Sequence, residues 1–97
     1  MPTPAAVESP TPENVHLYRA AVLAWRKAAI EERSRHADIR LANPHVPNHA
    51  AALAVRALAP EMTFAQAHLL AQKATNWAGQ AHHKWFWRGI PDNGYGL

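Results

Sequence analysis

The side chains best suited to chemistry stand together near the C-terminus, in residues 82–88. This segment reads His-His-Lys-Trp-Phe-Trp-Arg, so it combines two histidines, three large aromatic residues and two permanent cations. An exposed tryptophan beside cations can stack on a nucleic-acid base while the cations contact phosphates, or it can anchor a protein interface. The same aromatic residues can also pack inward, because each buries a large apolar area. The side of the helix on which each one lies decides between these roles.

Helical geometry separates the two tryptophans of this segment. At about 100° per residue, Trp85 continues a stripe of alanines along the preceding helix and should be buried. Trp87 then points to roughly the opposite side, which is polar. The alternative is a chain that turns near Phe86 and packs Trp87 against the C-terminal tail. The sequence thus predicts a binding site at the end of the last helix, formed by Trp87, Lys84, Arg88 and His83.

A second candidate surface lies on a polar stretch of the first helix. Three basic residues there could contact phosphates: Arg33, Arg35 and Arg40. Acidic residues are interspersed with these arginines. The alternative to phosphate binding is therefore a solvated face of ion pairs that binds no partner. The pairs expected from their i,i+4 spacing are Glu31 with Arg35 and Glu32 with His36.

A third candidate surface is apolar. The main seam of the first helix is formed by Val15, Tyr18, Val22, Trp25 and Ala29, spaced alternately by three and four residues. Leu23 and Ile30 lie on roughly the opposite side of that helix. The helix is therefore expected to contact something on two faces, and Leu23 and Ile30 are candidates for docking a partner.

Catalytic and metal-binding patterns are missing from the sequence. The chain has no cysteine, which excludes a disulfide scaffold and cysteine-ligated metal sites. Its seven histidines form no HExxH motif, and adjacent His82 and His83 point to different sides of a helix. Ser9 and Ser34 lie in no nucleophile motif, and the four glycines form no phosphate-binding loop. We therefore expect no enzyme activity, no cofactor and no bound metal.

Composition narrows the class of protein further. With 97 residues and a net charge of +3, the chain suits one small domain that is mildly basic, less so than dedicated nucleic-acid binders. It has no apolar run of about 18 residues and no signal-peptide pattern, so we expect a cytoplasmic protein. Seven arginines against three lysines, with abundant alanine, resemble proteins of GC-rich bacteria or their phages.

The sequence predicts an all-α fold. Closely spaced prolines indicate a disordered lead-in over residues 1–10, and residues 91–97 read as an irregular tail after one helical domain of residues 11–90. Thr11 is the expected first N-cap, Thr63 with Gln66 forms a capping-box pattern, and Gly89 is the expected terminator. The expected helices are two long antiparallel ones, about 12–42 and 64–88, joined by a short one, about 49–59.

The alanine stripe predicts how these helices pack. Small residues at spacings of four and three allow a close partner, for which the first helix is the natural choice. The stripe comprises Ala67, Ala71, Ala74, Ala78 and Ala81 and ends at Trp85. The first helix would be about 46 Å long, however, whereas a compact chain of this size has a radius of gyration of about 13 Å. Either the helix breaks near Glu31, or its polar half projects, or a second copy covers that half. Because no Gly or Pro interrupts the helix, we expect a projection or a homodimer and not a break.

These observations favour a small accessory protein that docks on a larger protein or nucleic-acid-processing complex through the aromatic and basic end of its last helix. The first alternative is direct nucleic-acid binding, in which Trp87 stacks and the arginines and lysines contact phosphates. The second is attachment to a membrane surface through residues 84–88. This last alternative is the weakest, because the rest of the helix has no matching apolar face. No motif in the sequence resembles a known family.

Overall fold

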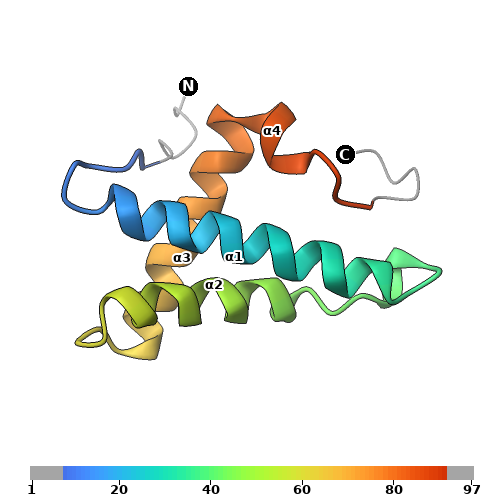
Figure 1. The fold of residues 1–97 in the computed structure, drawn as a ribbon, viewed down its shortest axis with the longest axis horizontal. Helices are drawn as coiled ribbons and strands as arrows, with labels where there is room; N and C mark the ends of the chain where they lie inside the picture. Colours follow the sequence, from blue (N-terminus) through green and yellow to red (C-terminus); the bar gives the residue numbers. More distant parts are fainter. Residues whose placement is uncertain (1–7, 92–97) are drawn as a thin grey trace, which may run out of the picture.

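The computed structural model describes residues 8–91 and confirms the all-α prediction, since this part of the chain contains no strand. Most of the expected lead-in and tail lies outside the described residues. The elements, in chain order, are α1 (Val15–Ser34), the 3-10 helix η1 (Ile39–Leu41), α2 (His45–Leu58), α3 (Phe64–Ala81) and α4 (His83–Trp87). Figure 1 shows the long helices and the short α4 that follows α3.

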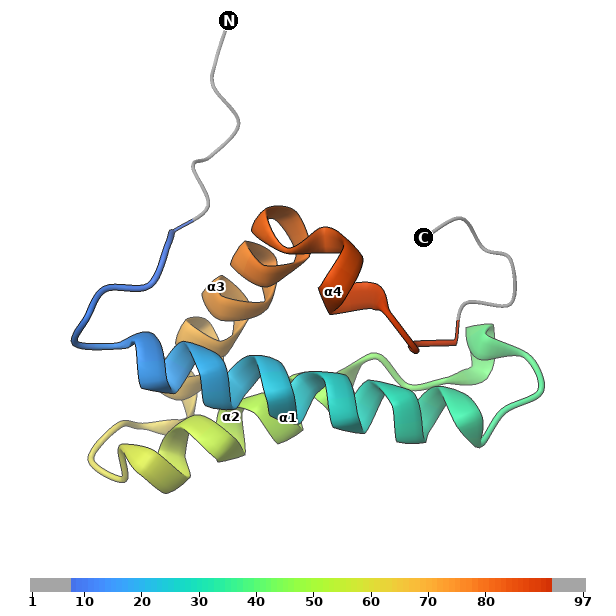
Figure 2. The ribbon, with the colours of Figure 1, turned by 45° about the horizontal axis from the view of Figure 1, so that its top comes forward.

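Helix α1 packs most extensively on α2, not on α3 as the alanine stripe suggested. The two run antiparallel side by side, while α3 crosses the pair and α4 turns back toward α1 (Figures 1 and 2). A short connection favours antiparallel neighbours, and the chain between α1 and α2 is short. Helix α2 also brings fully buried side chains to the contact, namely Ala51, Ala52 and Val55.

Alanines form much of the core. The predicted stripe is buried along most of α3, where its members are at most 3% exposed: Ala67, Ala71, Ala74 and Ala78. Ala21 of α1 is also fully buried, so small side chains line all three long helices and let them approach closely. The stripe prediction is therefore confirmed as far as Ala78, and it fails at Ala81, which is exposed.

The first helix is shorter than predicted: it ends at Ser34 and not near residue 42. The carboxylate of Glu32, only 7% exposed, accepts hydrogen bonds from the Arg35 side chain (2.8 Å) and from the backbone N–H of Asn43 (3.0 Å). His36 lies 3.2 Å from the same carboxylate. These contacts turn the chain back after Ser34, so the polar stretch does not continue as one projecting helix, and the break near Glu31 is the alternative that the structure supports. The radius of gyration of 13.8 Å is accordingly close to that of a compact chain of this length.

Two helix starts also differ from prediction. Helix α1 begins at Val15 with Asn14 at the N-cap position, and Thr11 caps the turn that precedes it. The Thr11 hydroxyl accepts from the Asn14 N–H (3.3 Å), and the Thr11 N–H donates to the Asn14 side chain (2.6 Å). Helix α2 begins at His45, four residues before the expected position, with Pro47 in its first turn, where a missing N–H leaves no helical bond unmade. The start of α3 is as predicted, since the Thr63 and Gln66 side chains form both bonds of a capping box.

The last helix is interrupted. The predicted helix of residues 64–88 is two helices, because His82 leaves helical geometry with φ −129° and ψ 44°. The chain restarts as α4 at His83 and stops after Trp87. Gly89, the expected terminator, has φ +79°, which places it in the left-handed region that glycine tolerates. That prediction is confirmed.

A matched pair of glycine substitutions tests this account of the C-terminal helices. A methyl group on Gly79 in α3 would meet only the Phe86 ring, at 3.9 Å, so Gly79→Ala should raise the free energy of unfolding by about 0.5–1 kcal/mol. Gly89→Ala should lower it by about 1 kcal/mol because of its positive φ. Thermal denaturation followed by circular dichroism measures both. A lower melting temperature for Gly79→Ala would contradict the packing described for Phe86.

Candidate functional site

Trp87, the centre of the predicted binding site, packs inside the protein. Its ring contacts Trp25 edge-on with centroids 5.9 Å apart and Phe86 edge-on at 5.0 Å. The Arg33 guanidinium lies 5.8 Å from its ring centroid. Trp87 is consequently only partly exposed. It lines a hollow with Asn76 and Gln80 of the predicted polar face, but it is not the fully exposed side chain that was expected.

The prediction for Trp85 is also wrong, in the opposite direction: this residue was expected to be buried and is 42% exposed. The cause is the break at His82, which changes the rotational phase of every later residue relative to the alanine stripe. Phe86 takes the interior position and is 2% exposed, stacked on Trp25 with ring centroids 5.0 Å apart. Trp85 is thus the tryptophan of this segment that a partner can reach.

Two arginines of α1 hold the C-terminal segment in place. Arg26 donates from Nε to the Phe86 carbonyl (2.9 Å) and from Nη2 to the Arg88 carbonyl, and its guanidinium lies 4.7 Å from the Trp85 ring centroid. Arg33 donates from Nη1 to the Pro91 carbonyl (3.0 Å). Carbonyls at the end of a helix have no partner within it, so these side chains satisfy them. Arg33 therefore binds a backbone carbonyl of its own chain, whereas it was predicted to contact phosphates of a partner.

Sequence reasoning missed Arg26 and also Arg19. The signal that could have found them is the spacing of seven between Arg19, Arg26 and Arg33. That spacing places three cations on one side of a helix, one above the other every two turns.

The remaining cations of the C-terminal prediction are at the surface. Lys84, Arg88 and His83 are all exposed, and Lys84 and Arg88 have no ion pair within residues 8–91. The Nδ1 atom of His83 lies 3.2 Å from the Gly79 carbonyl, a contact that spans the break between α3 and α4. Of the predicted site, the basic residues are thus exposed, while its tryptophan is only partly exposed.

The other predicted basic surface is mostly engaged in local ion pairs. Arg35 binds Glu32 at 2.8 Å, in place of the expected Glu31. The expected contact of Glu32 with His36 is present at 3.2 Å. Arg40 binds Asp38 at 2.6 Å, which lowers the pKa of that carboxyl group and raises the pKa of Arg40. Within residues 8–91, Arg35 pairs with Glu32 and makes no ring contact with the aromatic residues of α4.

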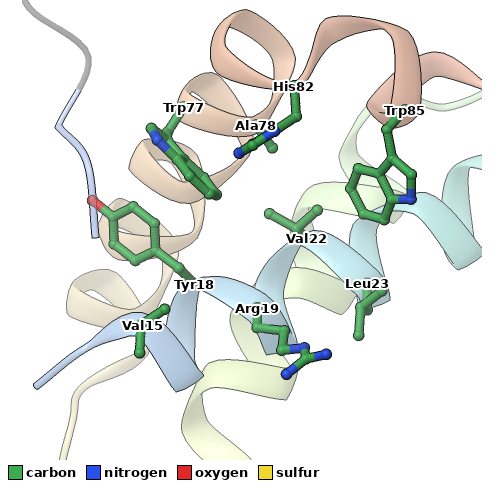
Figure 3. Close-up of a pocket in the computed structure, with 9 residues that line it drawn as sticks. All are labelled: Val15, Tyr18, Arg19, Val22, Leu23, Trp77, Ala78, His82 and Trp85. Atoms are coloured by element: carbon green, nitrogen blue, oxygen red, sulfur yellow. The ribbon is translucent and has the colours of Figure 1, made fainter. Parts of the chain in front are cut away.

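An open groove of about 430 Å³ lies between α1, the end of α3 and α4 (Figure 3). Its volume falls in the range of ligand-binding clefts, roughly 300–1,000 Å³. We call it the α1–α4 groove, and its lining residues are Val15, Tyr18, Arg19, Val22, Leu23, Trp77, Ala78, His82 and Trp85. Leu23, predicted as a docking residue, lines it, whereas Ile30 is half-buried and does not.

The floor of this groove is built from packed side chains. Tyr18 and Val22 are 2% and 4% exposed, and the Trp77 ring contacts Tyr18 edge-on at 6.0 Å and His82 edge-on at 4.8 Å. Burial, and to a lesser degree nearby Glu8, raises the pKa of Tyr18. Its hydroxyl therefore stays protonated at neutral pH and donates to the Glu8 carbonyl at 3.0 Å. The floor is accordingly a preformed surface.

The walls of the groove are exposed apolar side chains. Val15 and Leu23 are each 48% exposed and Trp85 is 42% exposed, and in Figure 3 Leu23 and Trp85 lie at the same end of the groove. Arg19 and His82 are the lining residues that carry or can carry a positive charge, and the lining includes no carboxylate. The groove can therefore bury apolar groups of a ligand while favouring negative charge at its rim.

The chemistry of other site classes is not assembled in the described residues. No group of three or more His, Asp or Glu residues between 8 and 91 is placed to hold a metal ion. Nor does that part of the chain contain a helix long and apolar enough to cross a membrane. Comparison with protein-family models, with curated proteins and with solved structures finds no match. The function must therefore be argued from the groove and its surroundings.

Removal of Glu32 tests the contact that turns the chain after α1. The Asn43 N–H bond lowers the pKa of Glu32, assisted by His36 and Arg35, so the folded state favours the carboxylate. Its contribution to stability is complete above the unfolded pKa of about 4.3 and is lost as the pH falls through the lower folded value. Glu32→Gln should melt at a lower temperature at pH 7 and lose less stability on acidification than the natural protein. Melting curves between about pH 3 and 7 measure this.

Glu31 is the matched control, since it is the neighbouring, exposed glutamate without an ion pair in the described residues. Glu31→Gln should leave the pH dependence of the melting temperature unchanged. Equal effects of the two substitutions would contradict the role given to Glu32.

Loss of Arg26 tests how α4 is attached. Arg26→Met keeps the apolar stem but removes the donors to the Phe86 and Arg88 carbonyls, at a cost of about 1–2 kcal/mol. We expect about tenfold faster amide hydrogen exchange in residues 83–90, because this segment opens locally before the long helices do. The control is Arg56→Met, which removes one exposed bond to the Met62 carbonyl at the far end of α2. Unchanged exchange in residues 83–90 would show that the aromatic contacts alone hold the segment.

Proposed function

We propose that this chain is a non-catalytic docking protein of bacterial or phage type, which binds a larger protein or complex through the α1–α4 groove. The observation that carries the proposal is the convergence of three large, half-exposed apolar side chains on one concave surface: Val15, Leu23 and Trp85. Grooves of this kind bind apolar anchors of a partner, and tryptophan is among the residues that contribute most to such interfaces.

The concave shape distinguishes these residues from other exposed apolar side chains. Leu53 on α2 and Leu69 on α3 are 48% and 54% exposed but do not line the groove. Single exposed leucines are common on soluble proteins and need no functional explanation. A groove with a rigid floor, an exposed indole and an apolar wall supports binding more strongly, because a partner can lose water from several groups at once.

The proposed anchor differs from that expected from sequence alone. Trp85 now takes the role first given to Trp87, since Trp87 is needed in the contact with Trp25 and Phe86. Docking through the end of the last helix is retained, and Leu23 of α1 joins the same surface. The proposal requires no catalytic group, and the lining holds no carboxylate or serine that could pair with His82.

Direct nucleic-acid binding remains the second candidate, because Lys84 and Arg88 are exposed in the same short segment as the exposed Trp85. It has less support than protein docking. Arg33, Arg35 and Arg40 all have intramolecular partners, which reduces the cations available to phosphates. Binding to single-stranded DNA that weakens steeply with added salt would favour this candidate.

Two matched substitutions test docking through the groove. Trp85→Ala should weaken partner binding about thirtyfold, as expected for an interface anchor worth about 2 kcal/mol, and Leu23→Ser should weaken it about tenfold. The measurement is capture of partners by the tagged protein from extracts of its own cells, with and without nuclease. Proteins that are retained after nuclease treatment and lost with both variants support the proposal.

The controls are residues of the same type and exposure outside the groove. Leu53 matches Leu23 at 48% exposed, and Phe64, 38% exposed, is comparable with Trp85 at 42%. Leu53→Ser and Phe64→Ala should retain the partner, and circular dichroism should show all four variants folded. Equal loss in the control variants, or a capture that disappears with nuclease, would overturn the proposal.

A further inference from the structure

We propose that the α1–α4 groove binds an amphipathic helix of another protein, with acidic side chains flanking its apolar face. This inference rests on the proposed docking function and adds the class of partner. It follows from the charges around the groove and from the length of its α1 wall. It also follows because the described residues offer neither a strand edge nor a row of exposed aromatic rings at the groove, which other kinds of peptide would need.

The charges exposed beside the groove on α1 are positive. Arg19 lines it, and Lys27 follows Leu23 by one turn; both are exposed and have no ion pair among residues 8–91. His82 lines the opposite side of the groove, and Lys84 is exposed on α4, which carries the groove residue Trp85. Complementary charge favours a partner that carries carboxylates at these positions.

The carboxylates of residues 8–91 do not offset that charge. Glu13 precedes α1 and Glu31 lies two turns beyond Leu23, and neither lines the groove. Glu8, near Tyr18 at the other end, is paired with Lys73 at 3.2 Å. The rim next to Leu23 and Trp85 is therefore left positive, and a basic partner would be repelled there.

A helix fits this surface better than an extended peptide. The described residues contain no strand edge to which a strand could be added. A proline-rich segment needs exposed aromatic rings side by side, whereas Tyr18 is 2% exposed and only Trp85 presents an open ring. The wall from Val15 to Leu23 spans about 12 Å, which matches apolar residues at i, i+4 and i+7 of a partner helix.

A second copy of this chain is a poor occupant of the groove. If two copies met through this face, Arg19 and Lys27 of one would approach the same residues of the other. Like charges placed together at an interface oppose binding. The charge pattern thus points to a different protein, one that is acidic where this one is basic.

Synthetic peptides test the partner class directly. The probe is a fluorescent amphipathic helix of about 18 residues, five turns, with leucine on one face and glutamate elsewhere. A second peptide has lysine in place of every glutamate, and a third keeps the glutamates but has serine in place of every leucine. Fluorescence anisotropy with the full chain should show the acidic leucine peptide binding at least tenfold more tightly than either of the others.

A pair of charge reversals then locates the contact. Arg19→Glu should weaken binding of the acidic leucine peptide about fivefold. Arg56→Glu makes the same change in net charge at an exposed arginine on α2, outside the groove, and should leave the affinity within about twofold. Leu23→Ser should weaken binding of the acidic peptide as strongly as it weakens capture of the natural partner.

The outcomes separate this inference from the docking function on which it rests. If the acidic and basic leucine peptides bind equally well and both need Leu23, docking stands and the acidic partner is wrong. If the serine peptide binds as tightly as the leucine peptide, charge alone explains binding and the helix inference is overturned. Failure of the acidic peptide to bind also overturns it, whereas the proposed function is decided by nuclease-resistant capture through Leu23 and Trp85.

Discussion

The close packing of alanine-lined helices is the constraint on which the rest of this structure depends. Alanines on α1, α2 and α3 are almost fully buried and bring the three backbones together. Each buried methyl group contributes only about 0.8 kcal/mol, however, compared with about 1.5–3 kcal/mol for a large apolar side chain. A core of this composition therefore depends on a few large residues from elsewhere in the chain to reach ordinary stability.

The C-terminal segment supplies those residues. Phe86 and Trp87 pack on Trp25, whose indole N–H donates to the Asn48 side chain at 2.9 Å, so this aromatic cluster joins α4 to both α1 and α2. Arg26 and Arg33 bind the carbonyls of the same segment. Trp87 is thus required inside the protein, and the helix break at His82 leaves Trp85 at the surface.

Three local signals in the sequence predicted the structure correctly, although the local pair of Glu31 with Arg35 did not form, and expectations that depended on distant contacts were wrong. The capping box at Thr63, the turn at Gly89 and the stripe from Ala67 to Ala78 depend on neighbouring residues, and all three are as predicted. The end of α1 depends on a bond between Glu32 and the backbone of Asn43, eleven residues later, with no Gly or Pro to indicate it.

The candidate site was predictable only where it depends on local helix geometry and not on contacts between distant residues. Leu23 could be found because its position on α1 follows from an uninterrupted helix. Trp85 and Trp87 could not be assigned, because the phase of α4 is set by the break at His82 and by contacts with Arg26 and Trp25. A seven-residue repeat of arginines was visible in the sequence, but the partners of Arg26 and Arg33 are backbone carbonyls, which leave no trace in residue types.

The groove lies where α3 crosses α1. Large side chains line it, including Tyr18, Trp77 and Trp85, but they do not fill the space above Val22 and Ala78. Trp85 is large enough to fill that space, but its ring lies at the edge of the groove, where the Arg26 guanidinium is 4.7 Å from the ring centroid. A partner that inserts aliphatic side chains there would add the apolar contact that the alanine core lacks. On this view, binding of a partner should also stabilise the fold, since the same surface serves both.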